Sequence, residues 1–390
     1  MNKQKLSKLQ NLLQEMTDTQ FVSGVSCMVL QGGEEQCYYE SGYRDIAGKL
    51  PMTRDTIFRL YSMTKPVTSA AVMMLLEEGK IDLLDPVAKY LPSFSNQYVM
   101  QNGVMTPVTR PVTIQNLLNM TSGLVYLGES NAAEVRSGVL FEEIIARLDS
   151  SHPLTTLEIM NRLGEIPLAF QPGEKWQYGI SADVLGAIVE VVSGMRFGEF
   201  LHKRIFEPLG MKDTAFYVPP EKQNRLAKVY DETPNGIQET DTCHLGIRNR
   251  MERDPAFESG GAGLVSTIDD YAAFTQMLLH NGTFRGQTLL SGKTVEFMTK
   301  AHLTPEQQPC VNQWDSMPGF TYANLLRILI DPGAALSFGS LGEYGWDGWL
   351  GTYMTNDPAN KLTLLIMQQK TNSGTTSFTR RIRNIVFSAL

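Results

Sequence analysis

One stretch of this 390-residue chain predicts much of its fold and its chemistry: Phe58-Arg59-Leu60-Tyr61-Ser62-Met63-Thr64-Lys65-Pro66. Ser62 is the only serine in the chain with a lysine three residues after it. Apolar side chains then recur at helical spacing from Pro66 to Glu78, and Gly79 provides a stop signal, so a buried helix is predicted directly after the pair. A spacing of three residues places Ser62 and Lys65 on one face of that helix.

The pair formed by Ser62 and Lys65 suits nucleophilic catalysis. The N-terminus of a helix carries positive potential and free N–H groups, which help a lysine to lose its proton and stabilise negative charge nearby. A neutral Lys65 can then accept the proton of the Ser62 hydroxyl. A helix-capping serine followed by a surface lysine would have the same spacing. A second motif is therefore needed to choose between catalysis and capping.

Strands are predicted near both ends of the chain, with helices between them. β-Branched and aromatic residues from Gly24 to Tyr39 predict two strands around a turn at Gly32-Gly33. Two more strands are predicted at 351–356 and 362–369, and further helices at the N-terminus and at 114–120, 142–148, 182–192 and 379–390. One lobe is therefore expected to have its sheet completed by the C-terminus, with a helical lobe inserted.

Composition excludes several classes of function. The net charge of −7 argues against a nucleic-acid partner, which would need a basic face. The five histidines do not cluster, so no metal is expected, and the chemistry predicted from Ser62 needs no cofactor. The N-terminus is amphipathic, unlike a secretory signal, and no run of about 18 apolar residues occurs. We therefore expect no membrane partner and a cytoplasmic location. The sequence does not indicate an oligomeric state.

The four cysteines allow one disulfide hypothesis. Cys27 and Cys37 could face each other across the first predicted hairpin, so a bond between them is geometrically conceivable. Free thiols are the favoured prediction, because nothing in the sequence suggests export to an oxidising compartment.

Further segments match one known family. They are Leu75-Leu76-Glu77-Glu78-Gly79-Lys80-Ile81, Leu84-Asp85-Pro86-Val87, Val112-Thr113-Ile114-Gln115-Asn116-Leu117-Leu118, Thr121-Ser122-Gly123-Leu124, Gln171-Pro172-Gly173 and Gly260-Gly261-Ala262-Gly263-Leu264-Val265-Ser266-Thr267. With the opening stretch, they resemble the serine β-lactamase-related family, which includes class C β-lactamases, penicillin-binding DD-peptidases and family VIII carboxylesterases. The resemblance covers nearly the whole chain.

The resemblance implies an α+β fold of the β-lactamase/transpeptidase type. Its antiparallel sheet is flanked by N- and C-terminal helices, and an all-helical lobe is inserted. A single catalytic unit over residues 1–390 is expected. Its α/β lobe is predicted at 1–61 and 240–390, and its mainly helical lobe at 62–239.

The resemblance also implies a catalytic tyrosine just before a helix. The segment Trp176-Gln177-Tyr178-Gly179-Ile180-Ser181 takes that place, so Tyr178 is the matching residue. The asparagine usual two residues later is Ile180, and the helix that follows begins Asp183-Val184-Leu185-Gly186, which looks more like the esterase branch. A phenol near an ammonium is expected to have a pKa well below its usual value and to act as a base or proton shuttle.

The third motif of the family, Lys-Thr-Gly or His-x-Gly on a strand beside the serine, is altered here. Gly345-Trp346-Asp347-Gly348-Trp349-Leu350-Gly351-Thr352 takes its place. Trp346 replaces the cation, Asp347 is predicted to bring negative charge to the substrate, and Gly348 allows close approach. The backbone N–H groups of Trp349 and Ser62 are expected to form an oxyanion hole. The plainer interpretation is a tryptophan-rich strand that packs in the core.

These motifs predict a serine hydrolase that works through an acyl-enzyme on Ser62, with Lys65 and Tyr178 moving the protons. A carboxylesterase acting on small or medium acyl esters is the favoured prediction. The alternatives are a β-lactamase or D-amino-acid peptidase acting on an amide, an acyltransferase that uses a small-molecule acceptor, and a non-catalytic acylatable sensor. Which of Lys65 and Tyr178 is the base stays open at this level, because their titrations are coupled.

Overall fold

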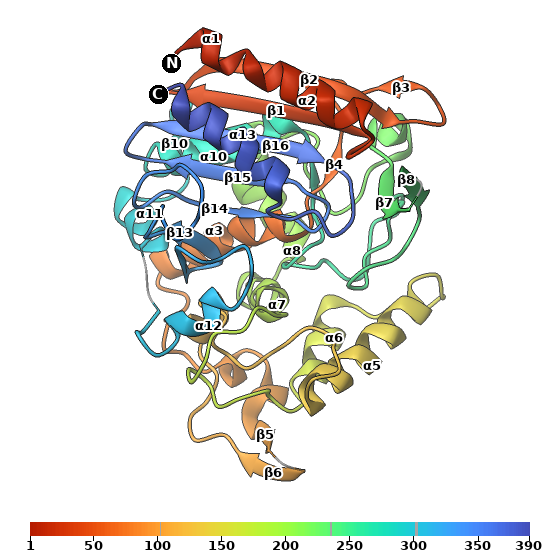
Figure 1. The fold of residues 1–390 in the computed structure, drawn as a ribbon. Helices are drawn as coiled ribbons and strands as arrows, with labels where there is room; N and C mark the ends of the chain where they lie inside the picture. The colour runs from red at the N-terminus through yellow and green to blue at the C-terminus, as the bar shows by residue number, and fades with distance from the viewer. Residues whose placement is uncertain (102, 235, 301–302) are drawn as a thin grey trace.

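The sheet expected from the two ends of the chain has eight antiparallel strands in a computed structural model that describes residues 1–101, 103–234, 236–300 and 303–390. Across the sheet they are β12 (Phe320–Ala323), β13 (Leu326–Leu329), β14 (Tyr344–Asp347), β15 (Tyr353–Asp357), β16 (Leu362–Gln368), β1 (Gly24–Gln31), β2 (Glu34–Asp45) and β3 (Leu50–Pro51). Strand β1 pairs with β16, so the two ends of the chain lie side by side (Figure 1). The predicted fold class is thereby confirmed.

The central strands β1 and β16 are buried along almost their whole length because both faces of the sheet are covered. Every residue of β16 is buried, and so is every residue of β1 except Gln31. The turn between β1 and β2 needs two residues with positive φ, which Gly32 (62°) and Gly33 (86°) supply. The strand predicted at 351–356 begins at Tyr353 instead, because Gly351, with a φ of 87°, closes a turn with Gly348.

Three terminal helices cover one face of the sheet. They are α1 (Lys3–Leu6), α2 (Lys8–Asp18) and α13 (Ser377–Ser388), and Figure 1 shows them close together in its upper part. Leu9 and Leu13 of α2 and Ile382 of α13 are buried against the strands in one apolar cluster. The amphipathic N-terminus therefore forms part of the core of this layer.

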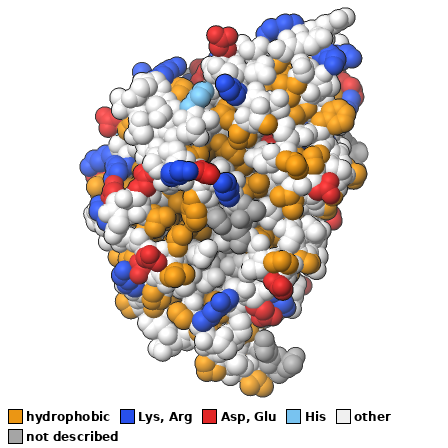
Figure 2. Space-filling view, turned by 90° about the vertical axis from the view of Figure 1, so that its left-hand side faces the viewer, with side chains coloured by type: hydrophobic (Ala, Val, Ile, Leu, Met, Phe, Trp, Pro, Cys, Tyr) orange, Lys and Arg blue, Asp and Glu red, His pale blue; other side chains and the backbone are white. Residues whose placement is uncertain are grey.

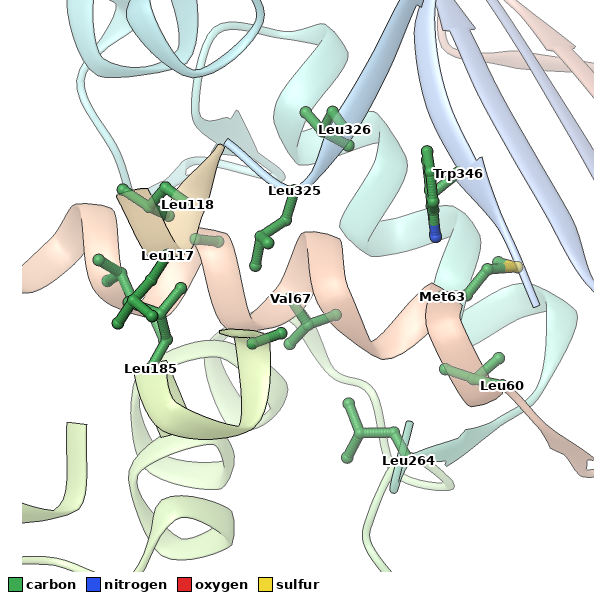
Figure 3. Close-up of a cluster of buried hydrophobic side chains, with 14 of the residues drawn as sticks. Leu60, Met63, Val67, Leu117, Leu118, Leu185, Leu264, Leu325, Leu326 and Trp346 are labelled. Carbon is green, nitrogen blue, oxygen red and sulfur yellow. The ribbon is translucent and has the colours of Figure 1, made fainter. Parts of the chain in front are cut away.

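The opposite face of the sheet packs against α10 (Ile268–Leu279) and α3 (Thr64–Glu77), the helix predicted after Ser62. Every residue of α3 from Thr64 to Leu75 is buried, so this helix is surrounded on all sides. Figure 3 shows Val67 on α3, with Leu325 of the β12–β13 turn on one side of this helix and Leu185 of the helical region on the other. A buried helix gives the residues at its N-terminus little freedom to move.

The middle of the chain is mainly helical. Its helices are α4 (Ile114–Leu118), α5 (Ala132–Arg147), α6 (Thr156–Leu163), α7 (Ser181–Ser193), α8 (Phe197–Leu201) and α9 (Glu207–Leu209), with hairpins β5–β6 (Tyr98–Gln101, Val104–Pro107) and β7–β8 (Val229–Thr233, Gly236–Thr240). Helix α5 begins ten residues before the predicted 142–148, because Asn131 caps it by accepting a hydrogen bond from the N–H of Glu134. The lobe boundaries at residues 61 and 240 stay a prediction.

The remaining elements join the two regions and the sheet edge. They are β4 (Phe58–Arg59) paired with β9 (Val265–Ser266), β10 (Thr283–Phe284) paired with β11 (Gln287–Thr288), α11 (Gly292–Met298) and α12 (Gln308–Asn312). The short β4–β9 pair matters most for function. It holds the segment just before Ser62 against the segment just after the glycine-rich run that ends at Gly263.

Charged side chains of both signs are mixed on the surface. Figure 2 shows acidic and basic side chains interspersed over one face, without a broad area of a single sign. None of the helices in the described ranges is long and apolar enough to cross a membrane.

All four cysteines are free thiols, as predicted. Across the described ranges, histidine, cysteine and acidic residues form no group of three or more that could hold a metal ion.

Candidate active site

Ser62 lies in a 3-10 turn, Tyr61–Met63, that leads directly into α3. Its side chain is partly exposed, whereas Tyr61 and Met63 on either side are buried. Tyr61 has a φ of 45°, a left-handed conformation that is costly for a bulky residue. The strained backbone at Tyr61 turns the chain so that Ser62 faces a cavity while its neighbours pack in the core.

Lys65 is fully buried one turn after Ser62, and its ammonium nitrogen has three partners. Nζ lies 3.2 Å from Oγ of Ser62, 3.1 Å from the hydroxyl of Tyr126 and 2.8 Å from the carbonyl oxygen of Gly261. Burial lowers the pKa of Lys65 to about 7. The reason given from the sequence, the helix N-terminus, was therefore incomplete, because withdrawal from water is the main cause.

Tyr178 lies against both members of the pair. Its hydroxyl interacts with Ser62, which lowers the pKa of Tyr178 slightly, and its ring lies 4.5 Å from Nζ of Lys65, measured to the ring centroid. Burial raises the pKa of Tyr178 well above its usual value, despite smaller lowering effects from Ser62 and Trp346. The expectation of a phenol that loses its proton easily was therefore wrong: the loss of hydration penalises a phenolate more than its neighbours stabilise it.

The altered third motif lies at the end of β14, beside the nucleophile. Trp346 is 2% exposed, and its Nε1–H donates to the hydroxyl of Tyr178 at 3.2 Å. A Cβ on Gly348 would lie 2.2 Å from the carbonyl oxygen of Leu60, so only glycine allows the strand to come so close to the segment that carries Ser62. The interpretation as core packing holds for the Trp346 side chain, which nevertheless contacts the candidate site.

Two backbone N–H groups near the nucleophile have no partner of their own. Within the described ranges, neither the N–H of Ser62 nor that of Trp349 donates a hydrogen bond to another protein atom. The Trp349 indole is held in place: its Nε1–H donates to Asn372 at 2.8 Å, and its ring packs on Tyr61 and on His244. The expected pair of oxyanion donors is thus free to bind a ligand.

Asp347 does not bring an unpaired negative charge to the site, as the sequence suggested. The Arg327 guanidinium, from the neighbouring strand β13, donates a hydrogen bond to Oδ1 of Asp347, and so does the Thr375 hydroxyl at 3.1 Å. Arg327 is 2% exposed and lies between the rings of Phe320, Trp346 and Tyr353. The pair is therefore neutral as a unit, with only the carboxylate reaching the cavity.

A cavity of about 580 Å³ opens above Ser62. Its aromatic walls are formed by Tyr126, Tyr178, Trp314, Trp346 and Trp349. Among the described residues that line it there is no lysine or arginine, whereas Asp315 and Asp347 are both present. Such a cavity suits an apolar, uncharged molecule better than an anion.

Three residues of the site were missed at the sequence level. Tyr126 follows the family segment that ends at Leu124, so its proximity to that motif was the available signal. His244 and Arg327 lie in no recognised motif and reach the site only through the fold. The ring of His244 stacks on Trp349 with centroids 4.0 Å apart, and burial lowers the pKa of His244 to about 4, so it is neutral at physiological pH.

Comparisons with known proteins show which proteins this chain is similar to. A sequence profile of the Beta-lactamase family matches residues 9–386. Protein Rv1367c of Mycobacterium tuberculosis is 34% identical over 92% of this chain and 88% of its own length. Esterase EstB of Burkholderia gladioli is 28% identical over 94% of this chain and 91% of its own. The structure of EstCE1, a hydrolase with promiscuous acyltransferase activity, matches with a TM-score of 0.83 at 26% identity, covering 99% of both chains.

Proposed function

This chain belongs to the Beta-lactamase family and is a serine hydrolase, and we propose that it hydrolyses uncharged carboxylic esters with small or medium acyl groups through an acyl-enzyme on Ser62. One observation carries the choice of substrate: the described lining of the cavity holds five aromatic side chains and no cation. The β-lactam antibiotics carry a carboxylate, which the family's Lys-Thr-Gly strand meets with its lysine. In this chain Trp346 stands in that place.

In the proposed mechanism Lys65 is the base. With a pKa of about 7 it is substantially neutral at physiological pH, and its Nζ is within hydrogen-bond distance of Oγ of Ser62. Lys65 takes the hydroxyl proton as Oγ forms a bond to the carbonyl carbon. The carbonyl oxygen becomes an oxyanion, which the N–H groups of Ser62 and Trp349 bind.

Tyr178 has the role of a proton donor in this proposal. Its raised pKa keeps the phenol protonated, so it cannot remove the Ser62 proton at neutral pH. As the bond between the acyl carbon and the alcohol oxygen breaks, Tyr178 gives its proton to that oxygen and regains one from the Lys65 ammonium. Water then attacks the acyl-enzyme and gives its proton to Lys65. Ser62 leaves as an alcohol after taking that proton back.

Acyl transfer to an alcohol is the second candidate function. The aromatic walls that suit an acyl group would equally suit an apolar alcohol, which would compete with water for the acyl-enzyme. EstCE1 is one similar structure whose name records such activity. A transferase would consume the ester faster when an alcohol is added, and the new ester would accumulate.

The proposal is tested with initial rates on a panel of p-nitrophenyl esters, nitrocefin and D-Ala-D-Ala peptides. Steady turnover of the neutral esters, with lower kcat/KM on nitrocefin and on the peptides, is the expected result. Preferred turnover of nitrocefin or of the peptides would contradict the ester assignment in favour of an amide substrate. A single burst without a steady state would instead identify an acylatable sensor.

A further inference from the structure

Asp183 is a buried acid that the mechanism above does not use. It lies in the first turn of α7, five residues after Tyr178, and is 2% exposed. Among the described residues, no lysine, arginine or histidine forms an ion pair with it. Burying an ionised carboxylate without a cation costs free energy, because the charge loses its hydration. We therefore expect a carboxyl group at such a place to have a function.

The carboxylate of Asp183 holds the loop that receives Lys65. Its Oδ1 accepts a hydrogen bond from the hydroxyl of Ser259 at 2.5 Å and from the N–H of Gly261 at 3.1 Å. The carbonyl oxygen of Gly261 accepts the hydrogen bond from Nζ of Lys65 at 2.8 Å. Gly261 is thus hydrogen-bonded to Asp183 on α7 through its N–H and to Lys65 on α3 through its carbonyl oxygen.

Close packing against both helices also holds this loop. A Cβ on Gly261 would lie 2.6 Å from Oδ2 of Asp183, and a Cβ on Gly260 would lie 2.4 Å from the carbonyl oxygen of Ala182. The carbonyl of Gly260 also accepts a hydrogen bond from Thr68 of α3 at 2.6 Å. The glycine pair therefore brings the loop into direct contact with both helices, where a larger residue would force it away.

Charge connects Asp183 to Lys65 as well. The titratable and charged groups around Lys65 are Tyr126, Tyr178, Asp183 and Asp347. Both acids favour the ammonium form, and Asp183 has the larger effect. Arg327 neutralises Asp347, whereas Asp183 has no such partner in the described part of the chain. The charge of Asp183 is thus the main one that opposes the effect of burial on Lys65.

We propose that Asp183 is the positioning residue for Lys65: it fixes the Gly261 carbonyl that orients Nζ, and its charge stabilises the ammonium that forms when Lys65 takes the proton of Ser62. This inference rests on the proposed role of Lys65. It predicts two separable effects of removing the charge of Asp183. The reaction of Ser62 should have a lower plateau rate, and Lys65 should become active at a different pH.

The test is the variant Asp183→Asn, which keeps an oxygen acceptor for Ser259 and Gly261 and removes only the charge. The neutral lysine is the active form, so in the wild type the rate rises as pH increases through the Lys65 pKa of about 7. Without the nearby negative charge the ammonium is less stable, the pKa of Lys65 falls, and this rise moves to lower pH. The ratio of the rate at pH 6 to the plateau rate should increase about 3- to 10-fold, while the plateau falls about 10-fold.

The readout is the second-order rate constant for labelling of Ser62 by a fluorophosphonate between pH 5 and 9, measured by intact mass, because it depends on no particular ester. Ser259→Ala is the matched control: it removes a hydrogen bond to the same oxygen without changing the charge, so its pH profile should keep the wild-type midpoint. Asp183→Ser, also neutral, replaces the asparagine variant if that variant does not fold.

The outcomes are distinguishable. If the neutral variants fold and keep the wild-type midpoint, Asp183 has a structural role only and the inference is overturned. If Ser259→Ala moves the midpoint of the pH profile as much as Asp183→Asn does, loop geometry and not charge controls the pKa of Lys65. That result also overturns the inference. If Ser62 is not labelled in the wild type at any pH, the proposed function itself fails.

Discussion

The indole Nε1–H of Trp346 donates a hydrogen bond to the hydroxyl of Tyr178, with 3.2 Å between the two atoms. The family motif places a lysine where Trp346 stands, and a lysine there would offer both Tyr178 and the substrate a positive charge. An indole offers a neutral donor and a large apolar surface. Burial raises the pKa of Tyr178, and the indole brings no positive charge to offset that effect; the same replacement leaves the described lining of the cavity without a cation.

The first prediction concerns the nucleophile. A fluorophosphonate or a slowly hydrolysed ester should add one acyl or phosphonyl group to the peptide that contains Ser62, because among the serines that the structure describes only Ser62 has its Oγ within 3.2 Å of the buried Lys65 nitrogen. Intact mass followed by peptide mapping locates the adduct. Ser62→Ala should lose the labelling, and an adduct on another serine would contradict the assignment.

The second prediction concerns proton transfer. Lys65→Ala and Tyr178→Phe should each lower kcat by roughly 10²–10⁴, the usual contribution of general acid–base catalysis. The double variant should be little worse than the poorer single one, because the two residues serve one proton path.

The substrate for this test must be an unactivated ester, since a good leaving group needs no proton from Tyr178 and would hide the loss. Near-wild-type activity of Tyr178→Phe on such an ester would assign Tyr178 to packing alone. Additive losses in the double variant would mean that Lys65 and Tyr178 act in independent steps.

The third prediction concerns Gly348. Gly348→Ala should lower kcat/KM on a neutral ester by about 10², because a Cβ placed 2.2 Å from the Leu60 carbonyl must push β14 and the N–H of Trp349 away from the nucleophile. Gly292→Ala at the start of α11 is a suitable control, since a Cβ there would meet only ordinary van der Waals contacts, the nearest being Cβ of Asn281 at 3.5 Å. Circular dichroism checks that both variants fold. Full activity of a folded Gly348→Ala would exclude Trp349 as an oxyanion donor that depends on this close approach.

The fourth prediction concerns substrate charge. A cation close to a carboxylate contributes roughly 1–3 kcal/mol when solvent has access, as charge-assisted hydrogen bonds do. Lacking that contact, the wild type should have a kcat/KM on nitrocefin about 10- to 100-fold below that on p-nitrophenyl butyrate. Trp346→Lys should narrow this gap by raising the nitrocefin value.

Trp346→Met provides the comparison for the charge-adding variant, because it removes the indole without adding a charge. Both variants lose the indole, but only Trp346→Lys adds a cation, so only Trp346→Lys should favour nitrocefin. Wild-type hydrolysis of nitrocefin that equals or exceeds hydrolysis of the ester would replace the esterase proposal with a β-lactamase one.

Local pattern was enough to predict the elements that carry the chemistry. The apolar spacing after Pro66 predicted α3, and the glycine pair at 32 and 33 predicted the first hairpin, because helix and turn signals lie within a few neighbouring residues. The start of α5 was missed, since its first turns at Ala132 carry no strict apolar repeat and its cap, Asn131, precedes them.

The sequence by itself therefore determined the family, the sheet built from both chain ends, and the identity of Ser62, Lys65 and Tyr178 as candidates. Only the tertiary structure decided their electrostatics. Burial depends on every segment that covers a group, so the lowered pKa of Lys65 and the raised pKa of Tyr178 could not be read from neighbouring residues. The partners are equally remote: Gly261 lies 196 residues from Lys65, and Trp346 lies 168 residues from Tyr178. Contacts at such separations exist only once the chain has folded.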